Sequence, residues 1–87
     1  MYYVYILQSL KDLRTYIGYS ADVAKRLYEH NLGKVTATKH SKPFKLLHTE
    51  EFGNLAEAKK RELYWKSGAG RRKLKGYFSN GFPPIRY

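Results

Sequence analysis

The spacing of apolar residues predicts three β-strands. Residues 2–8 (YYVYILQ) are apolar or aromatic at every position but the last, which is typical of a central strand covered on both faces. Residues 14–19 (RTYIGY) form a second β-rich segment around one glycine. A short polar stretch separates the two segments, so we expect an antiparallel hairpin whose register the sequence leaves open. Pro43 precedes the third predicted strand, residues 44–50 (FKLLHTE).

The first helix is predicted over residues 22–32. Ser20 or Asp22 can cap it, because a short side-chain oxygen accepts a backbone N–H that has no partner within the helix. Gly33 follows the last periodic position and suits the left-handed conformation that ends many helices. The residues expected to face the core are Val23, Ala24 and Leu27.

A second helix is predicted to begin at Asn54, because Glu57 three positions later would complete a capping box. We expect this helix to end at Gly68 and Gly70, since glycine disfavours the helix interior. The remaining segments are residues 71–78 (RRKLKGYF), predicted as a short basic helix or turn, and residues 79–87, predicted as an extended strap or a loose tail.

One carboxylate falls where an apolar residue is expected. Leu55, Ala58 and Trp65 form one stripe of the second helix, and at 100° per residue Glu62 lies within that stripe. Glu57 lies far round the helix and should face solvent. A carboxylate in a core stripe is costly unless it is paired or bound to a metal, so Glu62 is a candidate functional residue.

Length and order predict one α/β domain of the α+β type, with a small, mostly antiparallel three-stranded sheet flanked by helices. Its core spans about residues 1–70, and a basic extension follows at 71–87. The 87 residues include no cysteine, which excludes a disulfide framework and a thiolate metal site. His40 and His48 are interpreted as incidental. The absence of a basic leader and of a long apolar segment leads us to expect a cytoplasmic protein.

The net charge of +10 is concentrated toward the end of the chain. Residues 59–87 hold nine basic residues and one acidic residue. Such a lobe attracts polyanions through phosphate contacts and counterion release, so we expect nucleic acid as the partner and no membrane. The predicted phosphate-binding residues lie in the 34–45 loop and after the second helix: Lys39, Lys42, Arg71, Arg72, Lys73 and Lys75.

Three segments together resemble the GIY-YIG nuclease superfamily, and in particular its small standalone members. These are YVYIL at 3–7, TYIGYS at 15–20 and DVAKRLYEHN at 22–31. Tyr16-Ile17-Gly18 matches the second signature triplet. Tyr3-Val4-Tyr5 stands in the place of the first, with Tyr3 replacing its glycine. The resemblance covers residues 1–70, and with a downstream arginine and a helical glutamate in order it is fairly specific.

The resemblance implies a catalytic site with one divalent cation, Mg²⁺ or Mn²⁺, on Glu62. It implies that Arg26 holds the scissile phosphate and that Tyr5 and Tyr16 position or activate the attacking water. His30 shares a helix face with Arg26 and either assists proton transfer or packs locally. The sequence does not assign the base to either tyrosine. Asn80 is too distant to match the asparagine that many members carry after the glutamate helix.

The predicted activity is metal-dependent hydrolysis of phosphodiester bonds, expected in DNA, with low sequence specificity. Simpler interpretations exist for each residue. Arg26 can be a surface arginine, Glu62 can pair with Lys66 one turn later, and Tyr3, Tyr5 and Tyr19 can be packing residues. The alternative functions are a basic nucleic-acid-binding module without catalysis, and a protein that joins a partner in a repair or processing complex.

Overall fold

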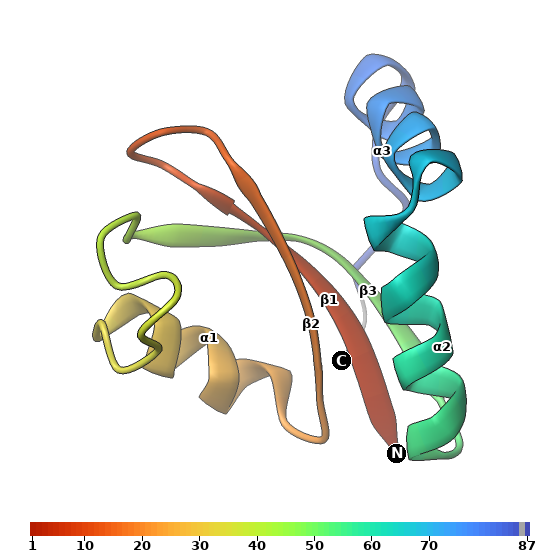
Figure 1. Cartoon of the computed structure of the whole chain (residues 1–87), viewed down its shortest axis with the longest axis horizontal. Helices are drawn as coiled ribbons and strands as arrows, with labels where there is room; N and C mark the ends of the chain where they lie inside the picture. Colours follow the sequence, from red (N-terminus) through yellow and green to blue (C-terminus); the bar gives the residue numbers. More distant parts are fainter. Residues whose placement is uncertain (86) are drawn as a thin grey trace.

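The computed structural model describes residues 1–85 and 87, and in that part of the chain three strands form one sheet with three helices. The predicted α+β class is confirmed (Figure 1). None of the helices in the described residues is long and apolar enough to cross a membrane. In chain order the elements are β1 (Tyr2–Ser9), β2 (Thr15–Ser20), α1 (Val23–Asn31), β3 (Phe44–Phe52), α2 (Leu55–Lys66) and α3 (Gly68–Asn80).

The sheet is antiparallel, with the strand order β2-β1-β3. The predicted hairpin and the central place of the first strand are therefore both confirmed. The register that the sequence left open places Tyr5 opposite Gly18 and Leu7 opposite Tyr16. Because side chains alternate along a strand, Tyr5 and Tyr16 lie on the same face of the sheet.

The two faces of the sheet are covered by different helices (Figure 1). Tyr5 and Leu7 pack with Val23 of α1 on one face. Val4 and Ile6 pack with Trp65 of α2 and with α3 on the other. The strand β1 is thus buried on both sides, as its unbroken apolar run predicts.

The first helix has the predicted ends. The Asp22 carboxylate caps it by accepting the backbone N–H of Lys25 at 3.0 Å, and Gly33 follows with a φ of 78°. Ser20 instead accepts the backbone N–H of Asp22. The prediction that Ala24 faces the core is wrong, because Ala24 is exposed on the solvent side of the helix.

The boundary after the second helix differs from the prediction. Helix α2 ends at Lys66, and the two glycines expected to end it form the first turn of α3, which is 13 residues long. Ser67 is both the last cap of α2 and the first cap of α3. Gly70 is buried there, because a Cβ at this position would lie 2.5 Å from the Cα of Trp65. Here glycine permits close packing and does not stop a helix.

His48, for which the sequence predicts no functional role, is buried in the aromatic core, with its ring centre 5.4 Å from those of Trp65 and Tyr77. Beside it, Glu50 accepts hydrogen bonds from Arg61 at 2.9 Å and from the Trp65 indole at 2.7 Å. Burial alone would raise the pKa of Glu50, but the 3.4 Å contact with His48 and the hydrogen bonds from Arg61 and Trp65 outweigh it and hold the pKa well below its usual range.

The tail after α3 has no regular secondary structure in its described part. It packs as the predicted strap at Phe82, whose ring lies 5.5 Å from that of Tyr77 and 5.1 Å from that of Phe78. Arg86, which belongs to the same predicted segment, lies outside the described residues.

Candidate active site

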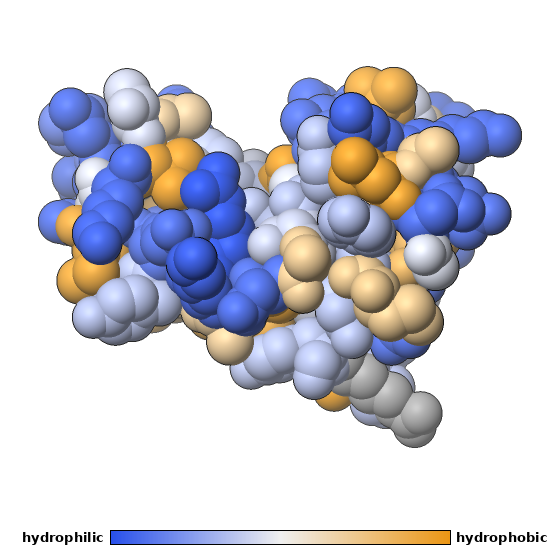
Figure 2. Space-filling model, turned by 90° about the horizontal axis from the view of Figure 1, so that it is seen from below, coloured by the Kyte–Doolittle hydropathy of each residue, from blue (hydrophilic) through white to orange (hydrophobic). Residues whose placement is uncertain are grey.

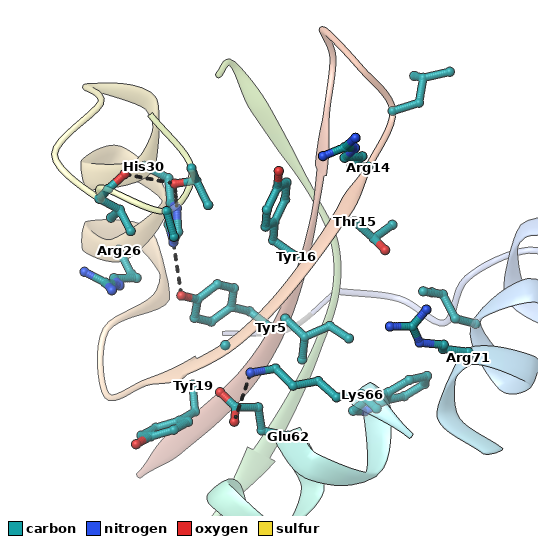
Figure 3. Close-up of a pocket in the computed structure, with 18 residues that line it drawn as sticks. Tyr5, Arg14, Thr15, Tyr16, Tyr19, Arg26, His30, Glu62, Lys66 and Arg71 are labelled. Atoms are coloured by element: carbon teal, nitrogen blue, oxygen red, sulfur yellow. Dashed lines mark hydrogen bonds and ion pairs between the residues drawn. The ribbon is translucent and has the colours of Figure 1, made fainter. Parts of the chain in front are cut away.

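A cleft of about 1160 Å³ runs over the edge strand β2, between α1 on one side and α2 with α3 on the other. Figure 2 shows the molecule hollowed between these two lobes. The five residues predicted to be catalytic come from four separate elements, and all of them line this cleft (Figure 3): Tyr5, Tyr16, Arg26, His30 and Glu62.

Gly18 explains how a tyrosine of the central strand reaches the cleft. It lies directly opposite Tyr5 in the hairpin, and the Tyr5 ring passes over it. A Cβ at position 18 would lie 2.5 Å from the Tyr5 hydroxyl oxygen. Only a residue without a side chain therefore leaves room for this phenol. Tyr3, which replaces the first glycine of the family pattern, packs at the side of the α1-covered face.

The Tyr5 phenol is joined to two buried partners. Its hydroxyl lies 3.2 Å from His30 Nε2, and His30 Nδ1 lies 2.7 Å from the Thr38 hydroxyl. A neutral imidazole that donates its Nδ1–H to Thr38 accepts a hydrogen bond from the Tyr5 hydroxyl at Nε2, so that both ring nitrogens are satisfied. Thr38, in the loop after α1, was not predicted, because nothing in the sequence shows that it folds back onto His30.

Burial sets the protonation of this pair. It raises the pKa of Tyr5. The neighbouring Arg26 guanidinium lowers this pKa, and the negative charge of Glu62 raises it further. Burial also lowers the pKa of His30, and the positive charge of Arg26 lowers it further. At neutral pH Tyr5 is therefore a phenol, and His30 is a neutral imidazole that can accept a hydrogen bond from it.

The Tyr16 phenol has a separate set of partners. Its hydroxyl lies 3.1 Å from the Ser41 hydroxyl, which donates to an oxygen of the Asp12 carboxylate at 2.9 Å. Asp12 is exposed in the turn between β1 and β2, and Ser41 belongs to the loop before β3. Neither residue was predicted, since they lie in irregular segments that only the fold brings together.

Arg26 lies in the cleft beside Tyr5 (Figure 3). Contact with the Tyr5 hydroxyl raises the pKa of Arg26. Its guanidinium also forms a 3.4 Å ion pair with Glu29, one turn along α1, and 40% of the side chain is exposed. A partly exposed guanidinium can turn its flat fork of N–H donors toward a phosphate in the cleft.

Glu62 lies on the other side of the cleft, on α2. Its side chain is only 16% exposed, and it forms a 3.4 Å ion pair with Lys66, whose side chain is 52% exposed (Figure 3). The predicted ion pair with Lys66 therefore exists, and it lies within the cleft. Glu57 is exposed, as predicted.

The donor set can be compared with what a divalent cation needs. No group of three or more His, Cys, Asp or Glu side chains occurs within the described residues, so a closed protein cage is absent from that part of the chain. Mg²⁺ and Mn²⁺ bind oxygen, and Mg²⁺ often binds through one carboxylate, several waters and a substrate phosphate. Glu62 beside an open cleft fits that mode and would be the protein ligand.

The predicted phosphate-binding residues surround the cleft unevenly. Arg71 lines it, together with Arg14, which was not predicted. Lys73 points partly back toward the core, with its ammonium 5.8 Å from the centre of the Trp65 ring. The other predicted residues are exposed on α3 and in the loop after α1: Arg72, Lys75, Lys39 and Lys42.

Comparison with known proteins links the chain to one family. Residues 1–77 match the model of the GIY-YIG catalytic domain. The chain is 39% identical over 75 residues to the UPF0213 protein SSP2268 of Staphylococcus saprophyticus, covering 85% of this chain and 90% of that protein. It is 42% identical over 74 residues to a UPF0213 protein of Syntrophus aciditrophicus, covering 83% and 84% of the two chains.

A solved structure shares the fold. The solution NMR structure of the UPF0213 protein BH0048 from Bacillus halodurans superposes with a TM-score of 0.55 at 36% sequence identity. The match covers 95% of this chain and 89% of that one.

Proposed function

The chain belongs to the GIY-YIG family, and on this basis we propose that it is a divalent-metal-dependent endonuclease. Members of this family are generally endonucleases. The proposed reaction is hydrolysis of phosphodiester bonds, with DNA as the expected substrate and low sequence specificity. The observation that supports it best is the convergence on one cleft of Tyr5, Tyr16, Arg26 and Glu62 from β1, β2, α1 and α2.

The charged residues would act on the phosphate from opposite sides of the cleft. Glu62 would hold Mg²⁺ or Mn²⁺, which when bound polarises a phosphate oxygen and lowers the pKa of a coordinated water. Arg26 would offer N–H donors to the phosphate and offset the negative charge that grows in the transition state. A charge placed where it is needed before the reaction is usually the largest single contribution to such catalysis.

The two tyrosines would hold the attacking water from the sheet side. Burial raises the pKa of the Tyr5 phenol, so Tyr5 stays protonated at neutral pH and does not supply the phenolate that a base would need. Its hydroxyl is held by neutral His30, which also accounts for the predicted involvement of His30. We therefore assign Tyr5 and His30 to the orientation of the reacting groups, and both must stay in place for the water to be aligned.

The test is cleavage of single-stranded and double-stranded DNA with Mg²⁺ or Mn²⁺, comparing wild type with Glu62→Ala. The matched control is Glu57→Ala, an exposed glutamate on the same helix. Metal-dependent cleavage that Glu62→Ala abolishes and Glu57→Ala leaves intact would support the proposal. Equal activity of wild type and Glu62→Ala would refute the assignment of Glu62. Binding without cleavage by any of the three would favour the non-catalytic module.

Binding should depend strongly on salt and weakly on sequence. Arg72→Gln and Lys75→Gln each remove one proposed phosphate contact, so each should reduce the slope of log affinity against log salt by about one. Lys60→Gln on α2 is the control, since this exposed lysine is not one of the proposed phosphate contacts. Equal affinity for unrelated sequences at matched salt is expected, and strong discrimination would refute the claim of low specificity.

A further inference from the structure

We propose that Asp12 and Ser41 are positioning residues that orient the Tyr16 hydroxyl, so that its oxygen accepts a hydrogen bond from the attacking water. Of the two tyrosines that would hold this water, Tyr16 would then be the one that accepts its hydrogen bond. The catalytic part of this inference rests on the proposed hydrolysis. The orientation of the Tyr16 hydroxyl stands on the geometry alone and can be tested without nucleic acid.

The polarity of the hydrogen-bond chain follows from counting protons. The Asp12 carboxylate has no proton to give, so the Ser41 hydroxyl donates its single proton to Asp12 over 2.9 Å. The Ser41 oxygen is then an acceptor toward Tyr16, which lies 3.1 Å away and must be the donor. With its proton directed at Ser41, the Tyr16 oxygen keeps its lone pairs free for a donor in the cleft.

The ionised state of Asp12 maintains this polarity. The backbone N–H of Arg14 lowers the pKa of Asp12 most, and the hydroxyls of Ser41 and Ser9 lower it further. Asp12 Oδ1 accepts the Arg14 N–H at 3.0 Å, which leaves Oδ2 for Ser41. Asp12 therefore remains an acceptor for Ser41 throughout the neutral pH range.

The hydrogen-bond chain from Asp12 to Tyr16 is also held in place by the two segments that carry Asp12 and Ser41. The buried Ser9 hydroxyl accepts the backbone N–H groups of Lys11 and Asp12 at 3.0 and 3.1 Å. The backbone N–H of Leu10 donates to the carbonyl of Pro43 at 2.8 Å, which ties the β1–β2 turn to the loop that carries Ser41. A fixed scaffold is what a positioning role requires, because a misplacement of about 1 Å can cost about 100-fold in rate.

The chain on Tyr5 has a different character. Tyr5 is buried, and its hydroxyl can donate its hydrogen bond to the imidazole of His30. Tyr16 is half-buried on the edge strand, where its hydroxyl borders both the cleft and the exposed turn of Asp12. The more accessible phenol, whose orientation is fixed by a carboxylate, is better placed to receive a water.

Asp12→Asn is the sharpest variant, because it changes charge and not shape. The backbone N–H of Arg14 must still be accepted, so the amide oxygen of the asparagine takes that bond and its NH₂ group faces Ser41. The amide then donates to Ser41, and Ser41 donates to Tyr16. The polarity of the chain is inverted, and the Tyr16 proton points into the cleft. Ser41→Ala breaks the chain, and Ser41→Thr retains the hydroxyl.

The first measurement is the ¹³Cζ chemical shift of Tyr16 in the free protein, assigned with Tyr16→Phe. The shift should change in Asp12→Asn and in Ser41→Ala and stay near the wild-type value in Ser41→Thr. This result would establish the orientation even if the protein were not a nuclease. A Tyr16 shift that is the same in all these proteins would overturn the proposal.

The second measurement is the single-turnover cleavage rate at saturating DNA. Asp12→Asn should lower this rate by about 10- to 100-fold with DNA affinity unchanged, and Ser41→Thr should keep most of the activity. In a Tyr16→Phe background Asp12→Asn should have no further effect, because both changes act through one hydroxyl. Additive effects would show that Asp12 only stabilises its turn. Wild-type protein that does not cleave would instead refute the proposed function.

Discussion

The two faces of the sheet share the central strand β1 but carry different kinds of side chains. On the face covered by α1, the side chains that meet are hydroxyls, an imidazole and a guanidinium, and their hydrogen bonds lead into the cleft. On the face covered by α2 and α3, an aromatic core surrounds Trp65, and the partly exposed carboxylate of Glu50 accepts hydrogen bonds from Arg61 and the Trp65 indole. Because side chains alternate along β1, its residues that pack around Trp65 point to one face and Tyr5 points to the other.

The two faces nevertheless contribute to one site. Helix α2 is anchored by Trp65 on the packing face, yet Glu62, three residues earlier, reaches the cleft around the β2 edge. An edge strand is what makes this possible, because a central strand would separate the two sides. The site can therefore be damaged either at its own side chains or through the packing that holds α2.

The largest expected difference between the faces is in stability. Trp65→Ala should lower the free energy of unfolding by about 3–5 kcal/mol, because Trp65 is fully buried. Tyr5→Phe keeps the ring and should cost about 1–2 kcal/mol through the unpaired His30 nitrogen, while cleavage is lost. Urea unfolding and cleavage assays on both variants measure this difference. A Tyr5→Phe protein as unstable as Trp65→Ala would contradict the separation of roles.

Gly18→Ala should separate the effect of the position of the Tyr5 hydroxyl from the effect of stability on the face covered by α1. The added methyl group would displace the Tyr5 hydroxyl, so the bond to His30 and the cleavage activity should be lost. Overpacking of this kind costs about 1–3 kcal/mol. Gly76→Ala in α3 is the control, since nothing lies within 4 Å of its Cβ position, and alanine should stabilise that helix by about 0.5–1 kcal/mol. The NMR signals of the His30 ring report whether Tyr5 has moved.

A smaller and pH-dependent effect is expected at Glu50. Because its pKa is lower in the folded state, it contributes stability above its unfolded pKa of about 4.5, and this is lost as the pH falls below that value. Glu50→Gln should cost roughly 2 kcal/mol at pH 7, since Arg61 and Glu50 are only partly exposed. The difference from wild type should shrink when urea unfolding is repeated at pH 3. A constant difference would mean that its charge is not what stabilises the fold.

Most of the fold could be predicted because its signals are local. The apolar run of 2–8, the cap at Asp22 and the misplaced carboxylate Glu62 each follow from the order of neighbouring residues. The start of α3 could not, since glycine in a sequence indicates freedom and only the packed structure shows that Gly70 allows contact with Trp65. His48 likewise depends on aromatic neighbours from two different helices.

The site was predictable for the residues that lie on regular elements. Periodicity and the family pattern bring Tyr5, Arg26 and Glu62 to one place, and all of them line the cleft. Thr38, the partner of His30, and Ser41, the partner of Tyr16, lie in a loop without periodicity, where only tertiary contacts decide which hydroxyl residues reach the site. Their roles in catalysis remain predictions for the experiments above.

Ser67 is the single residue between α2 and α3, so it fixes how these two helices follow one another. With Glu62 on α2 and the basic residues on α3, the position at which a nucleic-acid strand binds α3 would set the position at which it is cut. The distance along the strand from the bound phosphates to the cut would thus be set by protein geometry and not by base sequence. Inserting one residue into α3 just after Gly70 would turn the basic face beyond it, which includes Arg71 of the cleft, by about 100°, and this would move the bound strand relative to Glu62 on α2.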